Sequence, residues 1–301
     1  MKTKDKIVVI VGQTASGKSD LAVELALAFD GEVISADSRQ VYKGLDIGTG
    51  KITKKEMRGI PHYLLDVVEV DKQFSVVDFK KEAEHVIQRI LQKGRLPIVA
   101  GGTGFYIQSL VDNLVFPDVP PNSELQHTLE QKSTNELIEV LAKYDVNVPL
   151  HINNKNKRKI IRAIEIASSG NGITKLQKAP AQYDFLQIGI RVDKAMLRQK
   201  IEKRNTHMLD VGLTDEVQTL RNNGMTQAKI QELGFEYSYV LQYLEGKIQK
   251  DEMLYRMNTK TWQYAKRQET WFKRDTRIQW FDSTNNTAKK EIVDTIKRFV
   301  T

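Results

Sequence analysis

The 301-residue sequence contains no cysteine and only five histidines. The lack of cysteine excludes disulfides, thiol catalysis and cysteine-based zinc sites. No two of the histidines are spaced as ligands on one helix face, so a histidine metal site is not expected either.

Long apolar runs are also missing. No stretch approaches the roughly 20 apolar residues that span a membrane. The run Ile7–Val11 is too short for the core of a signal peptide, and it leads directly into a loop that contains glycine. We therefore expect a soluble, cytoplasmic protein with no membrane partner. We also expect it to act as a monomer.

Positive charge is in surplus. There are 46 lysines and arginines against 38 acidic residues, a net charge of +8. Such a surplus suggests a polyanionic partner, often nucleic acid, although a generally basic surface explains it equally well. Hydrophobic residues make up 40% of the chain, enough for one large domain or for a core with an inserted subdomain.

The first third alternates apolar strands with helical patterns. Ile7–Val11, Glu32–Ala36, Tyr63–Val68 and Leu96–Ala100 are strand-like, and Val76–Gln92 has a helical pattern. Strands alternating with helices are typical of an α/β fold with a parallel sheet, whose strands are buried on both faces.

The pattern changes after Val115. A proline-rich stretch is followed by helical segments at about Ser123–Lys143 and Asn156–Ser168, and apolar strands return at Leu186–Val192 and Ile278–Phe281. We predict a catalytic core formed by residues 1–115 and 184–301, with a helical insertion at residues 116–183 that binds nucleic acid.

The strongest motif matches G-x-x-x-x-G-K-[ST], a P-loop, between a predicted strand and a predicted helix. Its backbone N–H groups and the following helix N-terminus can surround a phosphate group. Lys18 adds a positive charge, and the Ser19 hydroxyl can hold a phosphate-bound Mg²⁺. The motif predicts a bound diphosphate or triphosphate without showing whether a phosphoryl group moves. The predicted binding residues are Gly12, Gln13, Thr14, Ala15, Ser16, Gly17, Lys18 and Ser19.

Two further features follow predicted strands. Asp37 lies just past the second strand, at the sheet edge where ligands bind in open α/β folds. It can act as a general base, orient a metal-bound water, or simply cap the next turn. Thr103 belongs to the glycine-rich segment Gly101–Gly104, which either approaches a ligand closely or forms a plain tight turn.

Two basic segments remain. The stretch Asn153–Arg162 includes Lys155, Lys157 and Arg158, and it can follow a phosphate backbone or form a solvated surface. The stretch Asp251–Arg274 reads as an amphipathic helix whose aromatic and basic residues would also suit single-stranded nucleic acid.

Taken together, these segments resemble the tRNA dimethylallyltransferase family over nearly the whole chain. The P-loop occurs in many families, but the combination is much more specific. The segments that carry the resemblance are GQTASGKS (12–19), ISADSRQVYKGLDIGTGK (34–51), PHYLLDV (61–67), GRLPIVAGGTGFY (94–106), RKIIRAIEI (158–166) and YAKRQETWF (264–272).

The resemblance implies a P-loop core and a reaction. Dimethylallyl diphosphate, held with Mg²⁺ by the P-loop and Ser19, would donate its prenyl group to N6 of the adenosine immediately 3′ of the tRNA anticodon. Asp37 would act as the general base, with Thr103 as its partner. The residues implied to contact the anticodon stem-loop are Asp37, Ser38, Arg39, Gln40, Thr103, Arg158, Lys159, Ile160, Ile161 and Arg162.

The sequence departs from the family pattern in its last third. Phe235 and Glu236 replace a tyrosine and a basic residue, and Trp262 and Gln218 stand where arginine is frequent. Three other readings compete with the tRNA enzyme: a small-molecule P-loop kinase, a dimethylallyltransferase acting on free nucleotides, and a nucleotide-gated RNA-binding module without catalysis. The basic insertion argues against the first two.

Overall fold

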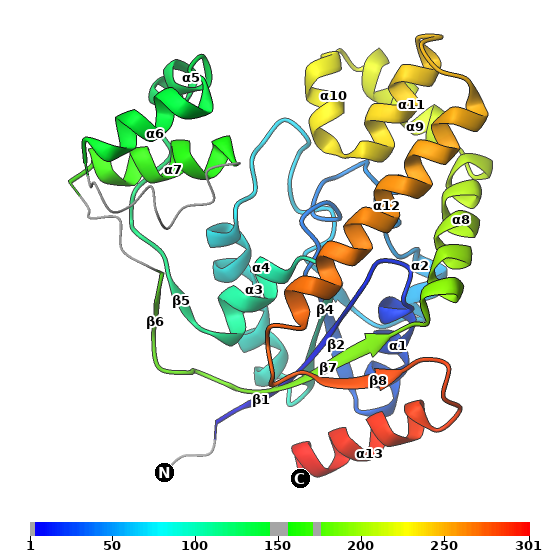
Figure 1. Cartoon of the computed structure of the whole chain (residues 1–301). Coiled ribbons are helices and arrows are strands. Elements are labelled where there is room, and N and C mark those ends of the chain that lie inside the picture. The colour runs from blue at the N-terminus through cyan, green and yellow to red at the C-terminus, as the bar shows by residue number, and fades with distance from the viewer. Residues whose placement is uncertain (1–3, 145–155, 171–175) are drawn as a thin grey trace. The chain divides into compact units, whose positions relative to one another are not determined.

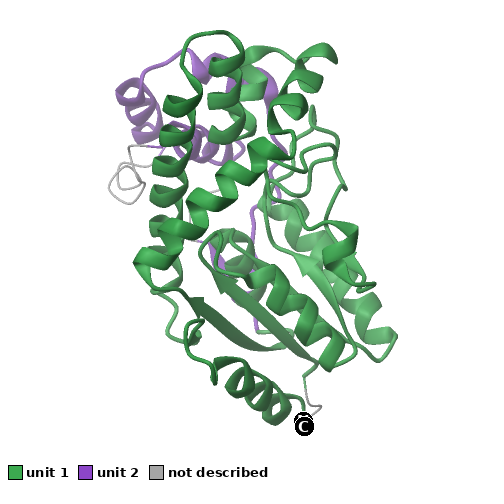
Figure 2. Ribbon diagram, turned by 90° about the vertical axis from the view of Figure 1, so that its right-hand side faces the viewer, with its two compact units in different colours: residues 1–111, 181–301 green, residues 112–180 purple. Residues whose placement is uncertain are grey.

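The computed structural model describes residues 4–144, 156–170 and 176–301. The chain forms two compact units, Met1–Val111 with Ala181–Thr301 (unit 1) and Asp112–Pro180 (unit 2), coloured separately in Figure 2. The sequence places the boundaries at residues 116 and 183. That the two units are independent domains stays a prediction.

Unit 1 is built on a six-stranded sheet with the order β3-β2-β4-β1-β7-β8 (Figure 1). Every ladder between these strands is parallel, which confirms the predicted α/β fold. The strands are β1 (Lys6–Gly12), β2 (Gly31–Ser35), β3 (His62–Tyr63), β4 (Leu96–Gly101), β7 (Asp184–Arg191) and β8 (Gln279–Asp282).

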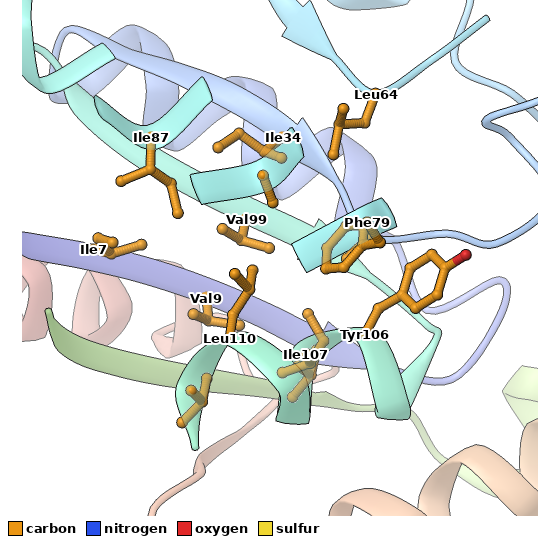
Figure 3. Packing of buried hydrophobic residues seen from close by; sticks show 14 of the residues in the cluster. Ile7, Val9, Ile34, Leu64, Phe79, Ile87, Val99, Tyr106, Ile107 and Leu110 are labelled. Atoms are coloured by element: carbon orange, nitrogen blue, oxygen red, sulfur yellow. The ribbon is translucent and has the colours of Figure 1, made fainter. Parts of the chain in front are cut away.

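One face of the sheet is covered by α3 (Val76–Gln92) and α4 (Gly104–Val111). The central strand β1 contributes Ile7 and Val9 to this layer, where they belong to the same buried cluster as Phe79 of α3 (Figure 3). The helix α3 has the bounds that the apolar pattern predicts.

The opposite face is covered by α1 (Lys18–Ala28) and α13 (Ala288–Val300). Here β1 contributes Val8 and Ile10, which pack in one cluster with Ile292 of α13. Because successive side chains of a strand point to opposite faces, a run of consecutive apolar residues is what a strand covered on both sides requires.

A group of helices in the second half of unit 1 has its own core. The cluster is formed by side chains of α8 to α12 and includes Leu213, Tyr237 and Met257, together with Leu45 from the segment after β2. The helices are α8 (Lys194–Asp210), α9 (Leu213–Asn222), α10 (Gln227–Leu233), α11 (Phe235–Leu244) and α12 (Lys250–Phe272). A short helix, α2 (Lys54–Met57), follows the segment after β2.

The helix α12 is the predicted amphipathic segment. Its buried residues include Met257, Thr261, Ala265, Gln268 and Phe272, which lie on one stripe. It runs beside α8 and α11 and also contacts β1 and α4. Although α12 has 23 residues, neither it nor any other helix in the described parts of the chain is apolar enough to cross a membrane.

Unit 2 contains three helices around a small apolar core within its described residues. The core includes Leu137, Leu141, Ile160 and Ile164. A two-stranded antiparallel sheet, which the sequence does not predict, closes the unit by pairing Leu114 with Lys178. The elements are α5 (Ser123–Glu130), α6 (Thr134–Ala142), α7 (Lys157–Ser168), β5 (Leu114–Val115) and β6 (Gln177–Lys178).

The predicted helical segment at residues 123–143 is two helices. Ser133 begins α6: its hydroxyl accepts the backbone N–H of Glu136, and the Glu136 carboxylate accepts the N–H of Ser133 in return. This capping box starts a new helix. Ser133 itself has an extended backbone conformation, so the helix is interrupted there.

The predicted third strand at Tyr63–Val68 is wrong in its extent. Only His62 and Tyr63 pair with β2. Leu64 and Asp66 have backbone φ angles of 60° and 54°, a left-handed conformation that cannot continue a strand. The apolar side chain of Leu64 is nevertheless buried in the sheet core, which explains why the sequence pattern is misleading.

Candidate functional site at the carboxyl edge of the sheet

The P-loop connects β1 to α1 and has the expected conformation. Gly17 precedes the helix with φ 88°, and Ala15 has φ 60°, which is uncommon for a residue with a side chain. The first N–H groups of α1 lack partners within the helix, so they remain available for an anion at this end of the helix.

Lys18 lies at the base of this loop. Its Nζ donates a hydrogen bond of 2.5 Å to the carbonyl oxygen of Gln13. Burial lowers the pKa of Lys18 to about 8, an effect that nearby Asp37 opposes and Arg204 adds to. The ammonium group therefore carries its charge at pH 7 in a partly desolvated place, where it attracts an anion more strongly than in water.

One cavity of about 220 Å³ joins the P-loop to the segment after β2. Residues of the loop form one side, and Asp37 and Gln40 belong to the other. Further parts of the lining come from elements far away in the sequence, namely Thr49, Gly50, Gly101, Gly102, Arg204, Tyr264 and Gln268. The cavity thus brings the two strongest sequence features into one site.

Asp37 caps a turn and also lines the cavity. Its Oδ1 accepts the backbone N–H groups of Arg39, at 2.9 Å, and of Gln40, at 3.4 Å, so it caps the turn that follows β2. Among the described residues its Oδ2 has no hydrogen-bond partner, and the side chain lines the cavity. One oxygen therefore holds the carboxylate in place while the other is available to a ligand.

Thr103 supports this turn from the neighbouring strand. Its Oγ1 accepts the N–H of Ser38 at 3.0 Å, and its own N–H donates to the carbonyl of Ala36 at 3.2 Å. Among the described residues that line the cavity, Gly101 and Gly102 belong to this segment and Thr103 does not. The structure therefore places Thr103 directly beside the Asp37 segment, although Thr103 itself is not among the described residues that line the cavity.

The glycines of this segment are required by close contacts within the protein. A Cβ atom on Gly101 would collide with the backbone of Ala36, and one on Gly104 would collide with the indole ring of Trp271. A Cβ on Gly102 would collide with the side-chain nitrogen of Gln268. These glycines therefore permit close approaches to other parts of the chain, and Gly101 and Gly102 also line the cavity.

The three residues after Asp37 have different surroundings. Gln40 lines the cavity and donates through Nε2 to the carbonyl of Gly50 at 3.2 Å. Arg39 is exposed, and one guanidinium nitrogen donates to the carbonyl of Glu232 at 2.9 Å. Ser38 is half-buried against Thr103.

The cavity residues that the sequence did not predict as site residues include Arg204, Tyr264 and Gln268. Arg204 donates to the hydroxyl of Thr14, 190 positions away, and to the carbonyl of Thr49 at 3.2 Å. Burial raises the pKa of the Tyr264 hydroxyl, and Asp37 contributes in the same direction. Tyr264 and Gln268 lie within the segment YAKRQETWF, and this resemblance was the only feature of the sequence that could have identified them as site residues. Nothing local distinguishes Arg204 from the other basic residues of α8.

Glu236 is a half-buried carboxylate close to this cluster of charges. Burial raises its pKa to about 7, although Arg204 and Arg39 act in the opposite direction. It occupies one of the positions at which the sequence departs from the family pattern.

The described residues contain no group of three or more histidine, aspartate or glutamate side chains that could hold a metal ion. Ser19 is exposed and lines the cavity together with Asp20 and Asp37. Mg²⁺ is usually bound by one or two protein oxygens, by substrate phosphates and by water. This set of oxygen donors fits such a metal, arriving with a phosphate ligand.

In unit 2 the predicted RNA-binding segment 158–162 separates into an exposed and a buried part. Arg158 and Lys159 are exposed. Ile160 and Ile161 are 0% and 5% exposed in the core of the unit, so the expectation that their side chains contact tRNA is corrected. On a helix with 3.6 residues per turn, five consecutive side chains cannot face one partner.

Arg162 stabilises unit 2 internally. It is half-buried and donates to the carbonyl of Val119 at 2.6 Å and to the carboxylate of Glu165 at 3.2 Å. Lys157 donates to the carbonyl of Glu130 at 2.6 Å. Lys155, which belongs to the same predicted cluster, lies outside the described residues.

The fold and the cavity define a class of protein: a P-loop α/β protein whose phosphate-binding loop lines one cavity together with a carboxylate just past the end of β2. The sequence model of the IPP transferase family matches residues 40–275. A tRNA dimethylallyltransferase of Carboxydothermus hydrogenoformans is 40% identical over 296 residues, which cover 95% of this chain and 94% of the relative. This chain belongs to the IPP transferase family.

Solved structures agree with this assignment. A tRNA isopentenylpyrophosphate transferase from Staphylococcus epidermidis is 37% identical, with a TM-score of 0.72 and 99% of both chains covered. A eukaryotic dimethylallyltransferase, solved in crystallographic snapshots of its action on tRNA, is 27% identical with a TM-score of 0.84. That comparison covers 98% of this chain and 79% of the eukaryotic one.

Proposed function

We propose that this protein transfers a dimethylallyl group from dimethylallyl diphosphate to N6 of the adenosine immediately 3′ of the anticodon in tRNA. The observation that carries the proposal is that Lys18 and Asp37 line the same cavity. A phosphate-binding loop at one side and a carboxylate at the other suit a reaction in which a diphosphate leaves and a proton is removed. The names of the relatives support a dimethylallyl group as the group transferred and tRNA as the acceptor.

The acceptor side rests on Asp37. An exocyclic amine is a weak nucleophile and needs its proton removed as the new bond forms. With Oδ1 engaged by the backbone of the turn, Oδ2 accepts the N6 proton. The bond from N6 to the allylic carbon forms, the bond from that carbon to the diphosphate oxygen breaks, and diphosphate leaves.

The donor side rests on the P-loop. The negative charge that develops on the departing diphosphate is stabilised by Lys18, by Arg204 and by the first N–H groups of α1. Two observations support this role for Arg204. Its guanidinium group donates a hydrogen bond to the Thr14 hydroxyl of the loop, and the residue lines the cavity. The Ser19 hydroxyl would hold Mg²⁺ together with the diphosphate, and the bound ion would add positive charge beside the leaving group.

The tRNA contacts fall on two surfaces. In unit 1, Ser38, Arg39 and Gln40 follow Asp37 directly, so a base that reaches Asp37 also meets this turn. A loop base must leave its stack to enter such a cavity, at a cost of a few kcal/mol. In unit 2, Arg158 and Lys159 are the exposed basic residues expected to contact phosphates of the anticodon stem-loop. We expect the enzyme to act as a monomer in the cytoplasm.

The test is a transfer assay with unmodified tRNA, dimethylallyl diphosphate and Mg²⁺, in which prenylated adenosine is measured by mass spectrometry. We expect product from the wild type and a rate lower by on the order of 1000-fold for Asp37→Ala, because the proton acceptor is lost. Asp294→Ala, which changes an exposed aspartate on α13, serves as the control and should react normally. Absence of product, together with phosphate transfer from ATP to a small acceptor, would establish a kinase and overturn the proposal.

A further inference from the structure

Gln268 connects two loops of the site through its side-chain amide. It lies on α12 and is only 5% exposed. Its Oε1 accepts the backbone N–H of Thr14 at 2.7 Å, and its Nε2 donates to the carbonyl of Gly102 at 3.0 Å. Since one partner can only donate and the other can only accept, the orientation of the amide is determined. A carboxamide has both functions, whereas a carboxylate or an alkyl side chain does not.

The two partners belong to different segments that both line the cavity. Thr14 is part of the P-loop. Gly102 directly precedes Thr103, whose hydroxyl accepts the N–H of Ser38, the neighbour of Asp37. Gly102 has no side chain, and a Cβ atom at this position would collide with the Gln268 amide. A short chain of contacts therefore runs from the P-loop through Gln268 to the Asp37 turn.

We propose that Gln268 is a positioning residue that sets the separation between the diphosphate-binding loop and the Asp37–Thr103 side of the cavity. This inference rests on the proposed transfer reaction. For transfer, the N6 atom, the allylic carbon and the leaving oxygen must be aligned, and a misplacement of about 1 Å costs on the order of 100-fold in rate. The Gln268 side-chain amide, hydrogen-bonded to both Thr14 and Gly102, holds that alignment.

The P-loop has other attachments to α12, so the fold does not depend on Gln268 alone. Gln13 donates through Nε2 to the carbonyl of Ala265 at 3.3 Å. Ala15 and Trp262 pack against the apolar cluster that contains Ala265. Variants of Gln268 should therefore fold with the loop still attached, while the link from the loop to Gly102 is lost.

The first test compares Gln268→Met with the wild type, measuring kcat and KM separately for tRNA and for dimethylallyl diphosphate. Methionine fills a similar volume but makes neither hydrogen bond. We expect kcat to fall on the order of 100-fold and KM for tRNA to stay unchanged, because no tRNA contact is removed. The control is Gln263→Glu, an exposed glutamine on the same helix, which should behave as wild type.

The second test uses Gln268→Glu and its pH dependence. The carboxylate keeps the acceptor for Thr14 but presents a second oxygen to the carbonyl of Gly102. Only the protonated carboxyl group can donate there. We expect the ratio of the variant's kcat to that of the wild type to rise as the pH falls, because protonation restores the missing bond. A residue with a merely structural role would give a constant ratio.

Wild-type kcat in Gln268→Met would overturn the inference. The inference would also be overturned if the loss of rate followed a lowered melting temperature and if the ratio of the kcat of Gln268→Glu to that of the wild type did not depend on pH. Hydrogen exchange of the segments 13–19 and 101–104 gives a readout that needs no activity. If the wild type makes no prenylated adenosine, the proposed function fails, whereas faster exchange of both segments in Gln268→Met would still support the coupling. Unchanged exchange in both segments would overturn the coupling in either case.

Discussion

The two surfaces assigned to substrates are built in different ways. In unit 1 the cavity is assembled by contacts between distant parts of the chain: Arg204 reaches Thr14 across 190 positions, and Gln268 reaches it across 254. In unit 2 the candidate surface consists of neighbours on one helix, Arg158 and Lys159. A single change in the cavity should therefore remove a function shared by several elements, whereas a change on the helix should remove only the contact of that side chain.

Among the effects on binding and stability, the largest is expected in the cavity, from Lys18→Met. Removing a desolvated charge that binds an anion should weaken the binding of inorganic diphosphate by on the order of 100-fold at pH 7, as measured by calorimetry with Mg²⁺ present. Lys18 in the wild type loses its proton as the pH rises through about 8. The affinity ratio of wild type to variant should therefore be largest below this pH and fall towards one above it. A ratio that stays constant up to pH 10 would contradict the role of the Lys18 charge.

A smaller effect is expected on unit 2, from the double change of Arg158 and Lys159 to alanine. Each lost phosphate contact should reduce the magnitude of the negative slope of log affinity against log salt concentration by about 1, and tRNA binding should weaken about 10-fold at low salt. The kcat at saturating tRNA should stay at the wild-type value. The control is the double change of Lys132 and Lys143 to alanine, also in unit 2. Equal loss in both double variants would show that only the general charge matters.

The smallest effect is expected from Glu236→Gln, and it concerns stability. The pKa of Glu236 is raised to about 7 in the folded protein, above its value in the unfolded chain. Folding therefore favours the protonated form. The folded protein loses stability as the pH rises from the pKa of the carboxyl group in the unfolded chain to about 7, because the buried group then has to carry a charge. The variant should be more stable than the wild type by on the order of 1 kcal/mol at pH 8, and the difference should vanish near pH 4. Urea unfolding at both pH values tests this, with Glu82→Gln on α3 as the exposed control. A variant less stable at pH 8 would show that the pairing with Arg204 and Arg39 outweighs the burial.

The success of the sequence predictions depended on how local the deciding interaction is. The P-loop was predicted with its flanking strand and helix because its conformation depends on consecutive residues and on two of its own glycines. Asp37 was correctly placed just past a strand end, where it caps the following turn, and its role as a general base stays a prediction. The helix at Val76–Gln92 was predicted with its observed bounds, since a capping box and an apolar stripe are both local signals.

The errors arose where a side chain's environment depends on another element. Leu64 is apolar and buried, yet its left-handed backbone ends the strand that its hydrophobicity suggested. Ile160 and Ile161 stand in a basic segment, but they are turned into the core formed by α5, α6 and α7. Arg204 carries no signal in its own neighbourhood, because its partners Thr14 and Thr49 come from loops far away in the chain.

The sequence by itself determined the strand–loop–helix of the phosphate site, the parallel α/β architecture and the family, because these follow from short patterns of residues. The tertiary structure alone decided which basic and amide side chains complete the cavity, which glycines are required by close protein contacts, and which residues of 158–162 remain exposed. The physical reason is that packing and hydrogen bonding between distant segments depend on how the helices lie on the sheet. Gln268 shows this most clearly: its type is visible in the sequence, but its two partners are defined only when α12, β1 and β4 have come together.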